Sequence, residues 1–205
     1  MFARLLLLAP MLWLGGCATL TSETVAPPGG FTEALQAGDC RSAYAFVEAG
    51  SGVSADQMLQ VAQTCLQVGD FLRTRRAAAS FLENHPAHPD ADYGAYLHAL
   101  AGFGDWSRAV TVDPEVRLSE GRALFMEISA FMRNRALSSY VQNLAPRLVT
   151  LREGIAAAEL ALATQSSRRG DTALARARAE YVVQYFPRTQ AAADAARLLM
   201  DLDSR

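Results

Sequence analysis

The sequence contains no lysine, and all 19 of its basic residues are arginines. A Schiff-base lysine, a phosphate-loop lysine and a lysine-rich membrane anchor are therefore excluded. The 21 acidic residues outnumber the arginines, so the chain lacks the positive excess that nucleic-acid binding requires. Three cysteines are too few for a small disulfide-framed protein. No apolar run approaches the roughly 20 residues that a membrane-spanning helix needs.

Glycine and proline are scarce, with 14 and 8 copies, whereas alanine occurs 38 times. Alanine has the highest helix propensity of all residues, and glycine and proline have the lowest. At 205 residues the chain is long enough for one domain or at most two small ones. This composition predicts an all-α protein.

Residues 1–16 have the pattern of a lipoprotein signal peptide. Arg4 precedes an apolar run of ten residues, Leu5–Leu14, and the run ends in Leu14-Gly15-Gly16-Cys17. Small residues before a cysteine are typical of a lipobox, in which the cysteine thiol takes the lipid. We predict a diacylglycerol and an N-acyl chain on Cys17, and no other cofactor. The alternative is an ordinary signal peptide with a chance cysteine.

Residues 17–30 are predicted to be the lipidated cysteine and a flexible tether, which is polar and ends in Pro27-Pro28-Gly29-Gly30. Three acyl chains exceed what stable membrane anchoring needs. Position 18 is Ala18 and not the aspartate that favours retention in the inner membrane. We therefore expect the protein in the outer membrane of a Gram-negative bacterium, anchored in the inner leaflet and facing the periplasm.

From residue 31 onward, apolar-periodic segments alternate with Gly-Asp pairs. These pairs are Gly38-Asp39, Gly69-Asp70, Gly104-Asp105 and Gly170-Asp171. Glycine permits the left-handed turn that ends one helix, and aspartate can cap the next. In two of the pairs a proline lies 17 residues after the glycine: Pro86 follows Gly69, and Pro187 follows Gly170. These two copies are 101 residues apart, close to three periods of the 34-residue tetratricopeptide repeat.

We therefore predict that residues 31–205 form a tetratricopeptide-like repeat superhelix, an α-solenoid of about four helix pairs. The units are 31–53, 54–89, 90–137 and 138–187, followed by a half repeat at 188–203. Small residues recur at matching positions, where helices must cross closely: Ala62, Ala78, Ala163 and Ala179. The fourth unit has an overlong first helix, which Pro146 is expected to begin or kink.

Three stretches, together with the lipobox, resemble the BamD (ComL/YfiO) family of lipoproteins of the outer-membrane β-barrel assembly machinery. They are residues 85–97 (HPAHPDADYGAYL), 147–152 (RLVTLR) and 168–191, which begins with RRGD and contains YFPRTQA. The resemblance covers most of the chain after Cys17. Relative to that family, residues 48–54 form a shorter first turn, and the last repeat is only half as long.

The resemblance implies a non-enzymatic scaffold that binds the POTRA domain of BamA, the other lipoproteins of the machinery and unfolded outer-membrane β-barrel proteins. Two arginines that matter for the BamA contact in the family match Arg169 and Arg178 of this sequence. The alternative is that both are solvated charges on helix surfaces. An alternative function is that of a pilotin-like or other envelope-assembly adaptor. No nucleophile–base set indicates an enzyme.

Two further groups of residues have two interpretations each. We expect the aromatic side chains either to line a peptide groove or to pack in the core; they are Tyr93, Tyr96 and Trp106. Cys40 and Cys65 form a disulfide in the oxidising periplasm, where the predicted repeat stack brings their helix ends together, or they are two small buried apolar residues.

Residues 85–92 contain a possible metal-ligand set, His85, His88, Asp90 and Asp92. Prolines at positions 86 and 89 interrupt the helix that would align these side chains, so we expect no metal site. His98 is expected in the core or in a groove. The segment Gly102-Phe103-Gly104 is interpreted as a turn.

Overall fold

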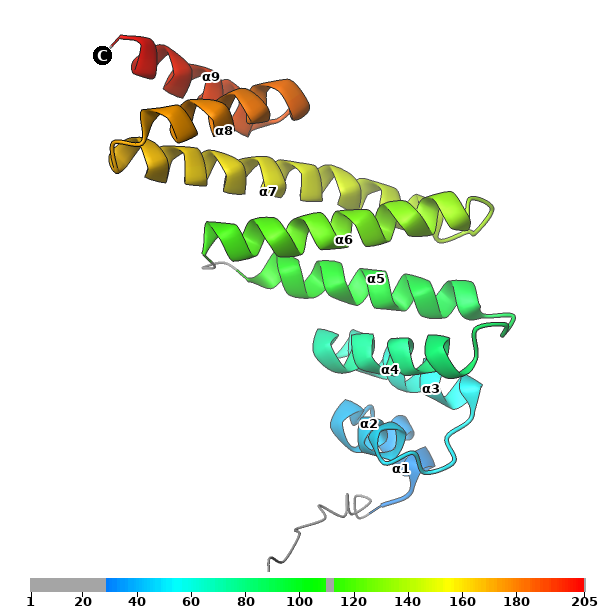
Figure 1. Cartoon of the computed structure of the whole chain (residues 1–205). Coiled ribbons are helices and arrows are strands. Elements are labelled where there is room, and N and C mark those ends of the chain that lie inside the picture. Colours follow the sequence, from blue (N-terminus) through cyan, green and yellow to red (C-terminus); the bar gives the residue numbers. More distant parts are fainter. Residues whose placement is uncertain (1–28, 110–112, 205) are drawn as a thin grey trace, which may run out of the picture.

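The computed structural model describes residues 29–109 and 113–204, and the regular secondary structure in these residues is entirely α-helical. The predicted signal peptide and Cys17 lie outside the described residues. The helices are α1 (Phe31–Gln36), α2 (Cys40–Glu48), α3 (Ala55–Gln67), α4 (Phe71–Asn84), α5 (Ala91–Arg108), α6 (Pro114–Asn134), α7 (Val141–Arg168), α8 (Thr172–Tyr185) and α9 (Gln190–Asp203). They stack in chain order from α1 to α9 (Figure 1).

Each helix packs against the next, and α1/α2, α3/α4, α5/α6 and α7/α8 form pairs that leave α9 as a half repeat. The prediction of a tetratricopeptide-like α-solenoid is therefore confirmed. The overlong first helix of the fourth unit is α7, with 28 residues. It begins at Val141, so the expectation that it starts at Pro146 is wrong, and Pro146 lies inside the helix.

The odd-numbered and even-numbered helices form two rows with different spacing. In the odd row, α3 contacts α5, α5 contacts α7 and α7 contacts α9. In the even row α2 contacts α4, but within the described residues α6 makes no close backbone contact with α4 or α8. The even row is therefore spread apart on the outer side of the stack. Grooves open there over α5 and α7.

Three of the four Gly-Asp pairs form the predicted turns. Gly38, Gly69 and Gly170 have φ angles of 69°, 72° and 83°, in the left-handed region that favours glycine. The aspartate that follows each glycine accepts a hydrogen bond from a backbone N–H in the first turn of the next helix. Both prolines of the repeated pattern, Pro86 and Pro187, come directly after a helix C-cap, as expected.

The fourth pair, Gly104-Asp105, does not form a turn. The prediction of a turn at Gly102-Phe103-Gly104 is wrong as well. All of these residues lie inside α5. A Cβ atom at Gly104 would overlap the ring of Phe71, and one at Gly102 would overlap the guanidinium of Arg75. Both glycines therefore allow α4 to pack closely on α5. The helix continues to Arg108, which donates from Nη1 to the carbonyl oxygen of Gly69 at 2.9 Å.

Two hydrophobic clusters form the core, one spanning α2–α5 and the other α5–α9, and both include residues of α5. The four repeated alanines, at positions 62, 78, 163 and 179, are completely buried, in agreement with their predicted place at helix crossings. No helix in the described part of the chain is both long and apolar enough to cross a membrane.

Candidate interaction surface

The outer groove over α7 contains a buried acid that binds two arginines. Glu159 of α7 has a side chain only 5% exposed. Its Oε2 accepts a hydrogen bond from Nη1 of Arg178 in α8 at 2.8 Å, and its Oε1 pairs with Nη2 of Arg122 in α6. The network thus connects three helices of two repeats. Sequence reasoning missed Glu159, because one glutamate in an alanine-rich helix gives no signal of burial.

Arg178 is therefore not merely a solvated surface charge. Its side chain is 27% exposed, and its Nε is buried without a hydrogen-bond partner in the described residues. The ion pair with Glu159 positions the guanidinium between α7 and α8. Such a fixed cation can pair with a carboxylate through donors that Glu159 does not use.

Arg169 occupies a different part of the same repeat. It is the C-cap of α7, and its side chain is exposed at the turn before α8. Arg178 is the seventh residue of α8. The two arginines that the family resemblance singled out are thus both near the surface, but only Arg178 belongs to the Glu159 network.

Tyr93 and Tyr96 of α5 form a cluster with Tyr140, the N-cap of α7. The Tyr96 and Tyr140 rings stack with centroids 4.6 Å apart, and the Tyr93 and Tyr140 centroids are 5.5 Å apart. All three residues are partly exposed. Burial raises the pKa of Tyr93, and the neighbouring Tyr140 and Tyr96 add to the rise. Sequence reasoning missed Tyr140, which comes from the next repeat.

Trp106 is not part of this cluster, so the interpretation of Tyr93, Tyr96 and Trp106 as one peptide groove is wrong. Trp106 follows Tyr93 by 13 residues, about 20 Å along α5. It is 5% exposed, and its ring packs against Gly121 and Gly154. The guanidinium of Arg117 lies 3.7 Å from the ring centroid. For Trp106 the alternative of core packing is therefore correct.

A second charged group lies in the groove over α5. Nδ1 of His98 and Oε1 of Glu127 are 2.7 Å apart, and Arg75 of α4 donates to Oε2 of Glu127 at 3.1 Å. Burial by itself would raise the pKa of Glu127, but the hydrogen bond and charge of His98, with those of Arg75, lower it overall. His98 is thus a groove residue, one of the two places expected for it.

The two cysteines of the helical repeats, Cys40 and Cys65, lie side by side. Cys40 is the first residue of α2, and Cys65 is in the last turn of α3. Both are buried, and their sulfur atoms are 2.08 Å apart, the distance of a disulfide bond.

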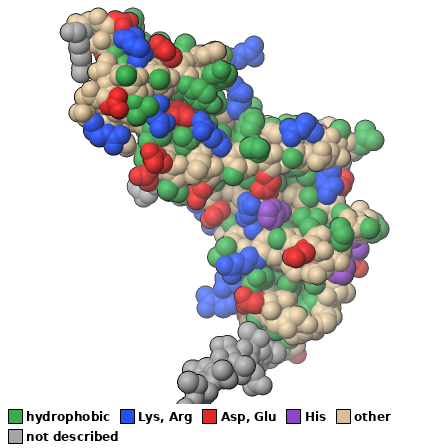
Figure 2. Space-filling model, viewed as in Figure 1, with side chains coloured by type: hydrophobic (Ala, Val, Ile, Leu, Met, Phe, Trp, Pro, Cys, Tyr) green, Lys and Arg blue, Asp and Glu red, His purple; other side chains and the backbone are tan. Residues whose placement is uncertain are grey.

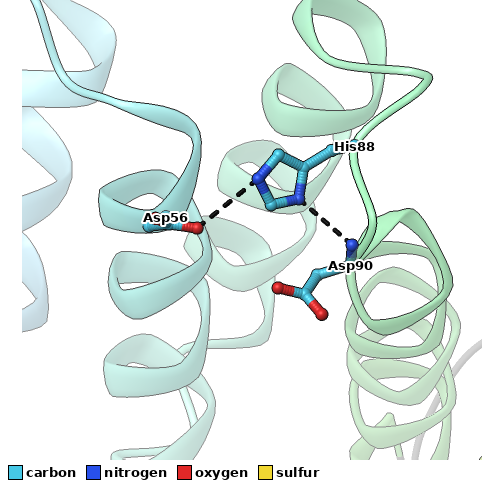
Figure 3. A group of neighbouring side chains, drawn as sticks. All are labelled: Asp56, His88 and Asp90. Carbon is cyan, nitrogen blue, oxygen red and sulfur yellow. Dashed lines mark hydrogen bonds and ion pairs between the residues drawn. The ribbon is translucent and has the colours of Figure 1, made fainter.

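The four residues considered from sequence as possible metal ligands do not lie together. Asp92 pairs with Arg135 at 3.2 Å. His88 and Asp90 instead lie beside Asp56 of α3, and candidate ligand atoms of these three residues are within 4.8 Å of one another (Figure 3). His85 does not belong to this group.

Both ring nitrogens of His88 have partners. Nδ1 accepts the backbone N–H of Asp90 at 3.1 Å, and Nε2 lies 3.5 Å from Oδ1 of Asp56. The group therefore connects α3 to the turn between α4 and α5.

Comparison with known proteins agrees with this architecture. Residues 31–203 match the family YfiO, described as outer membrane lipoprotein. The chain is also 26% identical over 178 residues to the outer membrane protein assembly factor BamD of Pasteurella multocida (strain Pm70). That alignment covers 82% of this chain and 68% of the relative. Because the family match extends over all of the described helices, the chain belongs to the YfiO family of outer membrane lipoproteins.

Proposed function

We propose that the chain is a BamD-like scaffold of the β-barrel assembly machinery, which aids the insertion of β-barrel proteins into the outer membrane. The observation that carries the proposal is the family match over residues 31–203. It spans every helix of the described structure, not one repeat, so it supports more than a generic solenoid. The name of the Pasteurella relative, an assembly factor, supports the same role.

The anchor of this scaffold is Cys17, which carries a diacylglycerol and an N-acyl chain, and residues 18–30 are the tether. A flexible segment of 13 residues has a reach of about 20 Å. The helical repeats are then held close to the inner leaflet of the outer membrane and face the periplasm.

The proposed partners are the POTRA domain of BamA, other lipoproteins of the machinery and unfolded outer-membrane β-barrel proteins. The fourth repeat binds BamA through Arg169 and Arg178. Arg169 is exposed at a turn, where a partner can approach it freely. Arg178 is fixed by Glu159 at the groove edge, so little side-chain entropy is lost when it pairs with an acid of the partner.

A pull-down from detergent-solubilised outer membrane tests the proposal, with the lipidated full-length chain as bait. Wild type is expected to recover BamA, and Arg169→Glu to recover at least about fivefold less, because a reversed charge repels an acidic partner. Arg133→Glu is the matched control, since Arg133 is equally exposed but lies in α6. Arg178→Lys keeps a charge beside Glu159 and tests whether the planar guanidinium is needed.

Absence of BamA from the wild-type pull-down would refute the BamA contact. Equal recovery with wild type and Arg169→Glu would refute only the role of Arg169. Depletion of the protein provides an independent test. Loss of outer-membrane barrel proteins supports the assembly role, whereas normal barrel proteins with lost piliation or secretion would contradict it and favour a pilotin-like adaptor.

A further inference from the structure

An apolar pocket of about 360 Å³ lies on the outer side of the stack, above α7 and between α6 and α8. It exists because α6 and α8 are spread apart over the long helix α7. Its apolar lining consists of Phe125 and Met126 of α6, Ile155 of α7, and Tyr181, Tyr185 and Phe186 at the end of α8. We call it the α6–α8 pocket. Figure 2 shows hydrophobic side chains beside basic and acidic ones over α7 and α8.

Large apolar side chains of this pocket are exposed to solvent. Met126 is 70% exposed and Tyr185 is 54% exposed, although both face a hollow that a further side chain can fill. Exposed apolar surface gathered around a concave site is typical of a surface that binds a partner. A methionine beside aromatic rings adapts its shape to different apolar side chains.

The charges of the pocket favour an anionic partner. Arg122 and Arg152 line it, and Arg178 contacts the same buried acid as Arg122. Arg122 and Arg178 share the single carboxylate of Glu159, and Arg152 forms no ion pair within the described residues. Arg152 donates from Nη2 to the carbonyl oxygen of Tyr185 at 3.0 Å. A guanidinium has five N–H donors, so Arg122 and Arg152 retain donors for a second acceptor.

Two other hollows in the described part of the chain lack this combination. The hollow between α7 and α9 is lined by alanines, and its arginine, Arg168, is accompanied by Glu153 and Asp194. In the groove over α5, Glu127 already binds both Arg75 and His98. The α6–α8 pocket, unlike these two, combines aromatic walls with an excess of arginine.

We propose that the α6–α8 pocket binds an acidic peptide segment of a partner protein. One aromatic or large aliphatic side chain of the segment fills the apolar hollow, and neighbouring carboxylates pair with Arg122 and Arg152. Each arginine–carboxylate pair adds a charge-assisted hydrogen bond at the pocket rim. The inference goes beyond the proposed BamA contact and depends only on this pocket.

Fluorescence anisotropy with two labelled nine-residue peptides tests the proposal on the full-length lipidated protein in detergent. The first peptide is Gly-Ser-Glu-Asp-Trp-Glu-Asp-Ser-Gly, and in the second all four acidic residues are replaced by lysine. The acidic peptide is expected to bind at least about tenfold more tightly than the basic one. Its affinity should also fall as the salt concentration rises.

Two pairs of variants locate the binding site. Met126→Glu places a negative charge in the pocket and is expected to weaken binding of the acidic peptide about tenfold. Met200→Glu is its matched control, because Met200 is 63% exposed on α9, outside the pocket. Arg152→Gln should weaken binding similarly, and its control is Arg168→Gln on the same helix.

Equal binding of the acidic and basic peptides would overturn the proposal, and so would unchanged binding by Met126→Glu. The Arg152→Gln variant loses a contact to α8, and circular dichroism detects any loss of folding that results. Met126 is a surface residue, so Met126→Glu remains informative in that case. The anisotropy titration contains only this protein and a peptide. Its result therefore does not depend on whether BamA is recovered in the pull-down.

Discussion

Glu159 shows how one residue can fix a surface that the sequence does not reveal. Among the described residues it is the one buried acidic side chain, and it binds arginines from two other helices. A buried carboxylate is tolerated only where it is paired and hydrogen-bonded. The two arginines in turn depend on it for their positions.

Replacement of Glu159 by glutamine is expected to lower the free energy of unfolding by about 2 kcal/mol, because it leaves the partly buried guanidinium of Arg178 and the exposed one of Arg122 without their charge partner. Urea denaturation at neutral pH measures this change. Asp203→Asn removes the exposed pair with Arg176 and serves as the control, with an expected loss below about 0.5 kcal/mol. A Glu159→Gln protein as stable as wild type would contradict this account of the network.

The pair of His98 and Glu127 leads to a prediction about pH. The folded-state pKa of Glu127 is lowered from its ordinary value of 4.5. The stabilisation from this carboxylate is therefore complete above the unfolded-state pKa, and it is lost as the pH falls through the folded-state pKa. Wild type should lose stability between about pH 5 and pH 3, and Glu127→Gln should lose less over this range.

Urea denaturation at several pH values between 7 and 3 measures the difference. Glu120→Gln is a suitable control, because Glu120 is an exposed carboxylate on the same helix. The free energy of unfolding of Glu120→Gln should change with pH as that of wild type does. Parallel profiles of wild type and Glu127→Gln would show that the His98 and Arg75 contacts do not stabilise the fold.

At the scale of the helices, Gly104 shows where a sequence pattern misleads. The same Gly-Asp dipeptide ends a helix at three places and lies within α5 at the fourth. The dipeptide alone does not distinguish a left-handed turn from a close helix contact, because both require the absence of a side chain. The difference lies in Phe71 of α4, a partner 33 residues away in sequence.

Gly104→Ala is expected to destabilise the protein by about 1–3 kcal/mol, although alanine favours a helix more than glycine does. The reason is the overlap of the new methyl group with the Phe71 ring. Phe71→Leu should relieve part of this overlap, so the double variant should lose less than the sum of the single variants. Simple additivity in urea denaturation would contradict a direct contact between the two sites.

The link between α2 and α3 provides a prediction about redox state. A disulfide between Cys40 and Cys65 closes a segment with a sequence separation of 25 residues. Mass spectrometry of the non-reduced protein should find neither thiol available for alkylation. The Cys40→Ala, Cys65→Ala double variant should be less stable by about 3 kcal/mol. Free thiols at both positions would contradict the bond.

The sequence was sufficient to predict the repeats, the three Gly-Asp turns and the crossings at buried alanines, because each depends on residues close together in the chain. The parts that could not be predicted depend on contacts between distant residues. Trp106 is buried because Gly121 and Gly154 leave room for its ring. Tyr140 completes the tyrosine cluster from the next repeat. Neither contact has a local pattern.

At the scale of the whole molecule, the two hydrophobic clusters meet at α5. Phe81→Ala, in the first cluster, is expected to cost about 3–5 kcal/mol. In a stack of repeats this loss should act mainly on neighbouring units. Hydrogen exchange should therefore accelerate strongly in α3 and α4, and much less in α8 and α9.

Val182→Ala is the reciprocal variant, because Val182 is completely buried in the second cluster. It should accelerate exchange in α7–α9 and leave α3 and α4 nearly unchanged. Uniform acceleration throughout the chain in both variants would show that the two clusters unfold as one cooperative unit.

The stacking of each helix on its neighbours in sequence also has a consequence for how the protein forms. Most contacts join elements that are adjacent in the chain, and the cysteine pair lies within the first three helices. Chains with such local contacts fold rapidly, because little loop-closure entropy is lost before a contact forms. The repeats can therefore fold one after another from the N-terminal end, before the C-terminal helices are in place.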